Sequence, residues 1–458
     1  MRNEKQQRMM KDPVTRRNFL TASAAGTAVG FAALADPGAA AAQSAGVKKS
    51  DLPNLTVKQV KVYVTDVTNI HRLNGSETGE IVAVITESGI EGSYTLGNRE
   101  RTTGWLEWAK ATLVGHNVVD LLPALNATSG MKSAGGLNAR ARTGGGPGQR
   151  PANAGARPST GNFVSIPSRS GGSWPDYKAA AADICLWDIL GKAVDRPIYQ
   201  LLGGKKDRMM AYASSQHLPS IEDYVPDAMK AKEQGYRGYK IHPGSGQHKD
   251  GPPIPSYVGH MEEIKLLRTA LGDEYVLAHD PVQAYNRFEA LKVGRLLDEL
   301  DYLWFEDPIR TTDLDGLVEL ANALDVPLHV GEFLASISDF AEYIRRGAVD
   351  VVRLIADNVG GISGSMRVGL LADAFGLECT PHNWGNVLDL ALHFHLELAL
   401  PNAYWFEMPH PAEYADRPYH KDKFRIDKDG YVTAPTAPGL GYPFDRDVLD
   451  KMTKRIDV

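Results

Sequence analysis

Residues 302–308 read YLWFEDP, an apolar run with three aromatic side chains that ends in two carboxylates and a proline. Similar runs lie on either side of it, YVLAHDP at residues 275–281 and PLHVGEF at residues 327–333. Helical patterns separate the three runs, at residues 287–300 and 314–324. Short apolar runs that alternate with helices predict parallel strands joined by crossover helices.

The same alternation continues through the second half of the chain. There are eight such runs: MAYASS, GYKIHP, YVLAHDP, YLWFEDP, PLHVGEF, VVRLIAD, LECTPH and YWFEMP. Eight strands alternating with helices predict an α/β fold with a parallel (β/α) barrel, in which sites lie at the C-terminal ends of the strands. A doubly wound open sheet is the alternative, although no G-x-G-x-x-G follows the first strand.

The preceding part of the chain has a different pattern. Apolar and polar residues alternate at 55–67 and 79–97, which predicts a small antiparallel sheet facing a core on one side. Residues 103–125 are helical in pattern, and an amphipathic helix is expected from Tyr177 to near Lys192. Gly, Ala, Ser, Arg and Pro dominate from about residue 128 to 173, which indicates an insertion or mobile loop.

The first 42 residues are typical of an export signal. Arg16 and Arg17 precede an Ala-rich apolar run from Phe19 to about Ala35, and small residues lead up to Ala42, where we expect cleavage. We therefore predict export by the twin-arginine route to the periplasm, with no membrane contact in the mature form. Retention of the apolar run as a membrane anchor is the alternative.

Composition narrows the class of ligand. The chain has 458 residues, 43% of them hydrophobic, and a net charge of -6 with a pI near 6.1. It is long enough for a large globular core, and it has no basic field that would attract nucleic acid. A small-molecule ligand is the better expectation. Cys185 and Cys379 lie in apolar patterns far apart, which favours two buried thiols over a disulfide.

Three of the predicted strands end in an acid. Asp280, Glu306 and Glu332 follow one another at intervals of 26 residues, about one strand–helix–loop unit, so neighbouring strands should bring them to one rim of the barrel. Three anions at one place repel each other unless a cation neutralises them. A hard, oxygen-rich set of ligands predicts Mg²⁺. Asp307 is assigned no chemistry.

Other strand ends carry bases. Lys240 and His242 lie two residues apart and should share a strand face, and His382 ends the seventh strand. Each alone is also compatible with a salt bridge or a hydrogen-bonded core histidine. Together with the acids they predict removal of a proton next to a carboxylate, with metal and positive side chains stabilising the enolate.

These features resemble the enolase superfamily, in its mandelate racemase/muconate lactonizing branch. The likeness covers about residues 54–445 and includes residues 182–204, VGGISG at 359–364, the three acids and His382. It implies a modified (β/α)8-type TIM barrel with an α+β capping domain built from N- and C-terminal segments. The expected boundaries are 54–176 for the cap, 177–425 for the barrel, and 426–458 for a segment that returns to the cap.

The resemblance also implies roles for single residues. Mg²⁺ is expected on the three acids, and Lys240 and His242 match a K-x-K pair in which His replaces the second Lys. The base on one face would be His242, with Lys240 nearer the substrate carboxylate and His382 on the opposite face. Glu407 matches an acid that hydrogen-bonds the substrate or its enolate.

Two departures from the family pattern concern the site. The acid that usually orients the histidine on the opposite face is replaced by Ile355. Asp357 lies two residues further on and is expected to point from the same strand face, so it is a candidate to orient His382. Val282 occupies a position where family variants often have Asn.

The resemblance to acid-sugar dehydratases favours a carbon–oxygen lyase that forms a 2-keto-3-deoxy acid. His242 would take the α-proton and His382 would protonate the departing β-hydroxyl, or the two would exchange roles. A racemase or epimerase is the alternative, because it also needs two bases. An exported, metal-dependent sugar-acid binding protein without catalysis stays open, as does assembly into a homo-oligomer.

Overall fold

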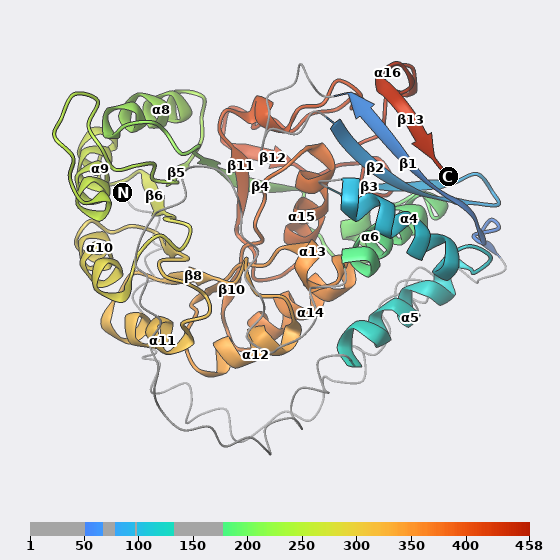
Figure 1. The fold of residues 1–458 in the computed structure, drawn as a ribbon, viewed down its shortest axis with the longest axis horizontal. Coiled ribbons are helices and arrows are strands. Elements are labelled where there is room, and N and C mark those ends of the chain that lie inside the picture. The colour runs from blue at the N-terminus through green and yellow to red at the C-terminus, as the bar shows by residue number, and fades with distance from the viewer. Residues whose placement is uncertain (1–50, 67–77, 97–98, 132–176) are drawn as a thin grey trace.

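The computed structural model describes residues 51–66, 78–96, 99–131 and 177–458, which form two parts (Figure 1). One is an antiparallel sheet made of strands from both ends of the chain. The other is a curled parallel sheet surrounded by helices. The predicted export signal at residues 1–42 lies outside the described residues. In the described part, no helix is both long enough and apolar enough to cross a membrane.

The smaller sheet has the strand order β13-β1-β2-β3. Its strands are β1 (Val57–Asp66), β2 (Thr78–Thr86), β3 (Glu91–Thr95) and β13 (Thr453–Asp457). The C-terminal β13 pairs antiparallel with β1, so the two ends of the chain build one sheet. This arrangement confirms a capping domain made of N- and C-terminal segments.

Both faces of this sheet are buried, not one as the sequence predicted. Val62 and Val64 pack into the main core, whereas Tyr63 packs in a second cluster with Tyr419 and Leu449. The alternation in β1 therefore separates two apolar faces rather than a core face from a solvent face. The C-terminal segment supplies the cover for the second face.

The helical pattern after β3 forms two helices instead of one. They are α4 (Arg99–Thr112) and α5 (Val118–Met131). Gly115 has a φ of 84°, a left-handed conformation that breaks the helix between them. The first residues of the predicted Gly-rich insertion thus belong to α5, and residues 132–176 lie outside the described part.

The helix α6 (Tyr177–Ala193) lies between the two parts, against β3 on one side and α14 on another. It was expected to be amphipathic, but every residue from Ala179 to Gly191 is buried. Its two carboxylates therefore need protein partners. Asp183 accepts hydrogen bonds from Ser363, and Asp188 accepts from the backbone of Ser93 and Leu440.

All eight predicted strands of the larger sheet are present, in the order β10-β9-β8-β7-β6-β5-β4-β11. The first strand, β4, pairs in parallel with both the second and the last. This ring-like order is that of a barrel and excludes a doubly wound sheet. The strands are β4 (Arg208–Ser214), β5 (Gly238–Ile241), β6 (Val276–His279), β7 (Phe305–Glu306), β8 (Leu328–Val330), β9 (Val351–Val352), β10 (Glu378–Cys379) and β11 (Trp405–Pro409), with β12 (Tyr431–Thr433) antiparallel to β4.

Helices cover the outside of the barrel (Figure 1). Several begin with a side chain that caps them, such as Asn286, whose amide oxygen accepts from the backbone of Glu289. The main helices are α8 (Ile221–Glu233), α9 (Ser256–Leu271), α10 (Arg287–Glu299), α11 (Leu314–Ala323), α12 (Ile337–Arg345), α13 (Ala356–Val359), α14 (Gly361–Ala374) and α15 (Val387–Ala399). The short α7 (Ile198–Leu201) and α16 (Arg446–Met452) lie before and after the barrel units.

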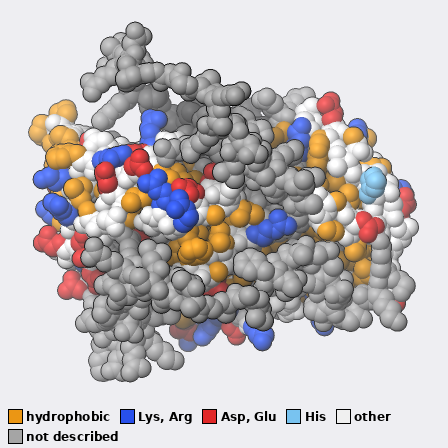
Figure 2. Space-filling view, turned by 90° about the horizontal axis from the view of Figure 1, so that it is seen from below, with side chains coloured by type: hydrophobic (Ala, Val, Ile, Leu, Met, Phe, Trp, Pro, Cys, Tyr) orange, Lys and Arg blue, Asp and Glu red, His pale blue; other side chains and the backbone are white. Residues whose placement is uncertain are grey.

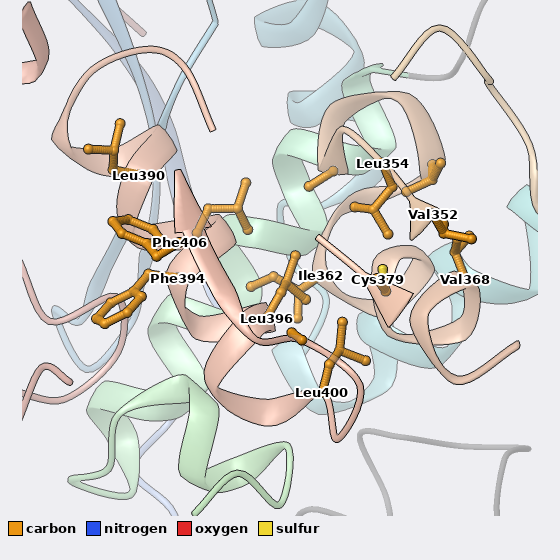
Figure 3. Packing of buried hydrophobic residues seen from close by; sticks show 14 of the residues in the cluster. Val352, Leu354, Ile362, Val368, Cys379, Leu390, Phe394, Leu396, Leu400 and Phe406 are labelled. Atoms are coloured by element: carbon orange, nitrogen blue, oxygen red, sulfur yellow. The ribbon is translucent and has the colours of Figure 1, made fainter. Parts of the chain in front are cut away.

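The core between the last barrel strands and their helices is apolar, as Figure 3 shows. Phe394 of α15 and Phe406 of β11 have ring centroids 4.6 Å apart. Cys379 lies in this core, and both cysteines are buried free thiols, as predicted. On the face of the molecule that Figure 2 shows, basic and acidic side chains of the described residues are mixed and do not form separate positive and negative patches.

The VGGISG segment has a structural explanation. Gly360 and Gly361 have φ values of 95° and 76°, in the left-handed region where side chains are strained. A Cβ on Gly361 would lie 2.6 Å from Asp183 Oδ2. Asp183 in turn accepts from Ser363 N at 3.0 Å and from Ser363 Oγ at 2.6 Å, which ties α6 to the start of α14.

We expect Gly361→Ala to lower the free energy of unfolding by about 2–4 kcal/mol, because it combines a strained φ with a contact against a buried carboxylate. Gly376→Ala is the matched control, since Gly376 has a φ of 72° but nothing within 4 Å of the place that a Cβ would occupy. It should cost only about 1 kcal/mol. Urea unfolding of both variants tests this, and equal losses would contradict a role for the Asp183 contact.

Candidate active site

The three predicted acids come from consecutive strands at one edge of the barrel. Asp280 directly follows β6, Glu306 is the last residue of β7, and Glu332 follows β8 by two residues. Because β6, β7 and β8 are neighbours in a parallel sheet, their carboxyl ends meet at the same rim. The acids are 1%, 0% and 6% exposed, so each needs a partner for its charge.

Lys240, on β5, is the first partner. Its Nζ lies 3.0 Å from Asp280 Oδ2, 3.0 Å from Glu306 Oε2 and 2.8 Å from Glu407 Oε1. Burial and the nearby Arg353 lower the pKa of Lys240, but these carboxylates outweigh them and raise it well above its usual value. Lys240 is therefore a fixed positive charge, not a base.

Arg353, just after β9, is the second partner and was missed from the sequence. It is fully buried and pairs through Nε with Glu306 and, at 3.2 Å, with Glu332 Oε2. Its Nη2 lies 2.5 Å from Glu407 Oε2. The available signal was an arginine in the middle of the apolar residues 351–356, where an unpaired charge would be costly.

His242 lies between two hydrogen-bond acceptors. Its Nδ1 is 2.6 Å from the carbonyl oxygen of Ser215, and its Nε2 is 2.9 Å from Asp280 Oδ2. A carbonyl oxygen and a carboxylate both require a donated proton. Both ring nitrogens therefore face acceptors, and this arrangement suits His242 to donate a proton.

His382 differs from His242 in its hydrogen bonding and in the charges around it. It follows β10, and its Nε2 lies 3.9 Å from Glu332 Oε2, beyond hydrogen-bonding distance. Burial, together with the positive charge of Arg353, lowers the pKa of His382 well below its usual value. Its imidazole is therefore neutral at pH 7 and can accept a proton.

The strand-face argument for Asp357 is wrong, because β9 ends at Val352 and α13 begins at Ala356. The period of two residues does not apply there. The structure instead places the carboxyl of Asp357 beside Tyr94 and Asp389. Burial, followed by repulsion from Asp389, raises the pKa of Asp357 to about 7. Among the described residues, no hydrogen bond or ion pair joins Asp357 to His382, so the structure does not support orientation of His382 by Asp357.

Glu407, in the middle of β11, is surrounded by protein donors. Besides Lys240 and Arg353, it accepts from Ser214 Oγ at 2.8 Å, from the backbone of Asn383 at 2.8 Å and from Trp384 Nε1 at 3.2 Å. Burial raises the pKa of Glu407, but Arg353 and Lys240 outweigh burial and hold this pKa well below its usual value. In this structure the carboxylate organises the two cations.

The balance of charge at this rim fits a divalent cation. Among the described residues, five buried carboxyl groups lie near one another at this rim, where Lys240 and Arg353 are the two fixed cations: Asp280, Glu306, Asp307, Glu332 and Glu407. Both oxygens of Asp307 lack a hydrogen-bond partner in the described part of the chain. Burial is the main cause that raises the pKa of Glu306 to about 8 and that of Glu332 to about 7. Lys240 and Arg353 thus supply too little positive charge to keep Glu306, Asp307 and Glu332 ionised together with the other acids.

The type of donor also fits Mg²⁺, which prefers carboxylate oxygens. The arrangement, however, is centred on side-chain cations. In the described part of the chain, no three His, Cys, Asp or Glu side chains already surround one position suited to a metal. Lys240 and Arg353 bridge the acids instead. Metal ligation by Asp280, Glu306 and Glu332 stays a prediction.

Comparison with known proteins shows which family and which enzymes this chain is similar to. The family model described as Enolase C-terminal domain-like matches residues 223–448. Arabinonate dehydratase from Saccharolobus solfataricus is 31% identical over 277 residues, which cover 59% of this chain and 71% of that enzyme. L-talarate/galactarate dehydratase from Salmonella typhimurium is 31% identical over 263 residues. That match covers 57% of this chain and 61% of the relative, less than two thirds of its length.

Solved structures agree with the fold. D-glucarate dehydratase from Agrobacterium tumefaciens, in complex with magnesium, has a TM-score of 0.68 and 25% identity, covering 88% of this chain and 100% of that one. The 3,6-anhydro-D-galactonate cycloisomerase from Zobellia galactanivorans has a TM-score of 0.66 and 21% identity, covering 87% and 100%. The second likeness concerns the fold alone.

Proposed function

Because the chain belongs to the enolase superfamily, we propose that it removes the α-proton of an acid sugar and eliminates the β-hydroxyl, giving a 2-keto-3-deoxy acid. The observation that carries this proposal is that two histidines with different surroundings lie at the rim of the three acids: His242 between two hydrogen-bond acceptors, and His382 3.9 Å from Glu332 Oε2. His382 and His242 follow strands on either side of the three that carry the acids. The named relatives support an acid-sugar substrate.

The states of the two histidines favour one of the two role assignments. His382, neutral, would accept the proton from C2, and the electron pair of the broken C–H bond would form an enolate. His242, which has an acceptor at each ring nitrogen, would donate a proton as the C3–O bond breaks and water leaves. The enol that results becomes the 2-keto acid by taking up a proton at C3.

The remaining residues would bind and stabilise charge. Lys240 and Arg353 lie between the acids and supply fixed positive charge close to a substrate carboxylate and its enolate. Asp280, Glu306 and Glu332 would hold Mg²⁺, which supplies further positive charge against the substrate when it is bound. Closely packed, buried side chains exclude water from these charges, and the lower dielectric strengthens their attraction to a negatively charged substrate.

Two alternatives remain from the sequence. A racemase or epimerase is favoured by the second histidine, since a proton removed by one could return from the other on the opposite face. A binding protein without catalysis would keep the acids but use neither histidine. Both alternatives predict that no water is lost from the substrate.

A screen separates the three functions. A panel of aldonates and aldarates is incubated with the protein and Mg²⁺ in D₂O, followed by an assay for keto acids and by proton NMR at C2. A 2-keto-3-deoxy product supports dehydration. Deuterium at C2 without loss of water indicates epimerisation, and neither signal with any acid sugar would refute both catalytic proposals.

A further inference from the structure

A second histidine lies beside His242, on the loop that follows β4. His217 and His242 have ring centroids 5.4 Å apart with an angle of 53° between the rings. The loop lies at the carboxyl end of its strand, the same rim that carries the acids. His217 is exposed, whereas His242 is only 8% exposed, so His217 presents the accessible ring at this position.

The hydrogen bonding of His217 fixes which nitrogen is free. Its Nδ1 lies 2.9 Å from the carbonyl oxygen of Pro243, which can only accept, so Nδ1 carries the proton. Nε2 then has a lone pair, and the described part of the chain offers it no partner. Although part of the ring is exposed, the protein packed around the rest of it, followed by the charge of His242, lowers the pKa of His217, so the ring stays neutral at pH 7. The loop thus holds a hydrogen-bond acceptor in place.

Trp384 encloses His242 from another direction. The two rings have centroids 5.7 Å apart at an angle of 72°, and Trp384 Nε1 is fixed by hydrogen bonds to Ser214 and Glu407. An indole nitrogen can only donate, and this donor is already used. Of these two rings next to His242, only His217 can therefore accept from a ligand.

We infer that His217 accepts a hydrogen bond from a substrate hydroxyl beyond C3 and so selects polyhydroxylated acids over short 2-hydroxy acids. This inference rests on the proposed function, in which His382 and His242 serve C2 and C3. The next hydroxyl groups along the sugar chain are the ones left to meet an acceptor beside His242. His217 is in this sense a specificity-determining residue, not a general acid or base.

The test compares His217→Phe, which keeps a ring but removes the acceptor, with His217→Gln, which restores one. For the aldonate turned over fastest in the screen, we expect the Phe variant to raise KM about 5- to 30-fold with kcat changed less than about 3-fold. Gln should recover part of the loss. D-glycerate, which has no hydroxyl beyond C3, should show no change in C2 exchange. His116→Phe, at an exposed histidine between α4 and α5, is the control.

Failure of this inference can be told from failure of the proposed function. If the wild type dehydrates an aldonate and His217→Phe leaves its KM unchanged, His217 is not the acceptor and the function stands. If no acid sugar reacts, D-gluconate binding by calorimetry in the presence of Mg²⁺ replaces KM as the readout. Binding weakened in the Phe variant then supports the inference without catalysis, and unchanged or absent binding overturns it.

Discussion

Replacing His382 with asparagine is expected to lower the turnover of an acid sugar by at least ~100-fold, the scale of a general acid or base. The reason is that the neutral imidazole of His382 is the group able to accept the α-proton, and the amide of asparagine cannot do so. Mg²⁺ affinity, measured by calorimetry, should stay within about 2-fold of the wild type, because His382 Nε2 is 3.9 Å from the nearest acid oxygen.

Exchange of the C2 proton tests the role of His382 separately from water loss. If His382 is the base, His382→Asn should lose exchange and dehydration together. Exchange that persists while dehydration is lost would mean that His242 is the base and that the roles are reversed. Near-normal turnover would remove His382 from the mechanism. His116→Asn, on the exposed turn after α4, controls for loss of a histidine elsewhere.

The parts of the site that sequence could predict are those that follow from strand geometry. Asp280, Glu306 and Glu332 each end a strand, and parallel strands in sequence order are neighbours in a barrel. Their meeting at one rim therefore follows from spacing alone. Lys240 and His242 could be placed on one side for a similar reason: β5 ends only at Ile241, and both side chains contact Asp280 Oδ2.

Other parts of the site could not be predicted because they depend on where a strand stops. β9 ends at Val352, three residues before Ile355. The two-residue alternation of strand side chains therefore does not extend to Asp357, and it could not predict where this side chain lies. Arg353 was overlooked for a related reason. Its three partners come from β7, β8 and β11, and no local pattern shows that these carboxylates converge on one guanidinium.

The contacts between the capping sheet and the barrel could not be predicted from the sequence either. The helix expected to be amphipathic contains Asp183 and Asp188, yet both are buried. Their partners lie far away in the chain, at Ser363 and Leu440 among others. A carboxylate on a helix is usually solvated, so only the tertiary structure shows that these two join the cap to the barrel.

Arg353→Met should destabilise the protein by about 3–5 kcal/mol at pH 8, because it leaves buried carboxylates of Glu306, Glu332 and Glu407 without their shared cation. The loss should be measured by denaturant unfolding with EDTA present, so that bound metal does not replace the missing charge. Arg345→Met is the matched control, since Arg345 is exposed and pairs with Glu342 on the same helix. It should cost less than about 0.5 kcal/mol.

The effect of Arg353→Met should also depend on pH, with a sign set by the carboxylates. Burial already raises the pKa of folded Glu306 to about 8 although Arg353 lowers it, and Arg353 helps hold that of Glu407 well below its usual value, so removal of Arg353 raises the folded pKa of both groups. A carboxyl group with a raised folded pKa costs stability as pH rises above its unfolded pKa. The variant should therefore be closer to the wild type at pH 5 than at pH 8. A loss of equal size at both pH values would show that Arg353 stabilises this rim through packing and not through its charge.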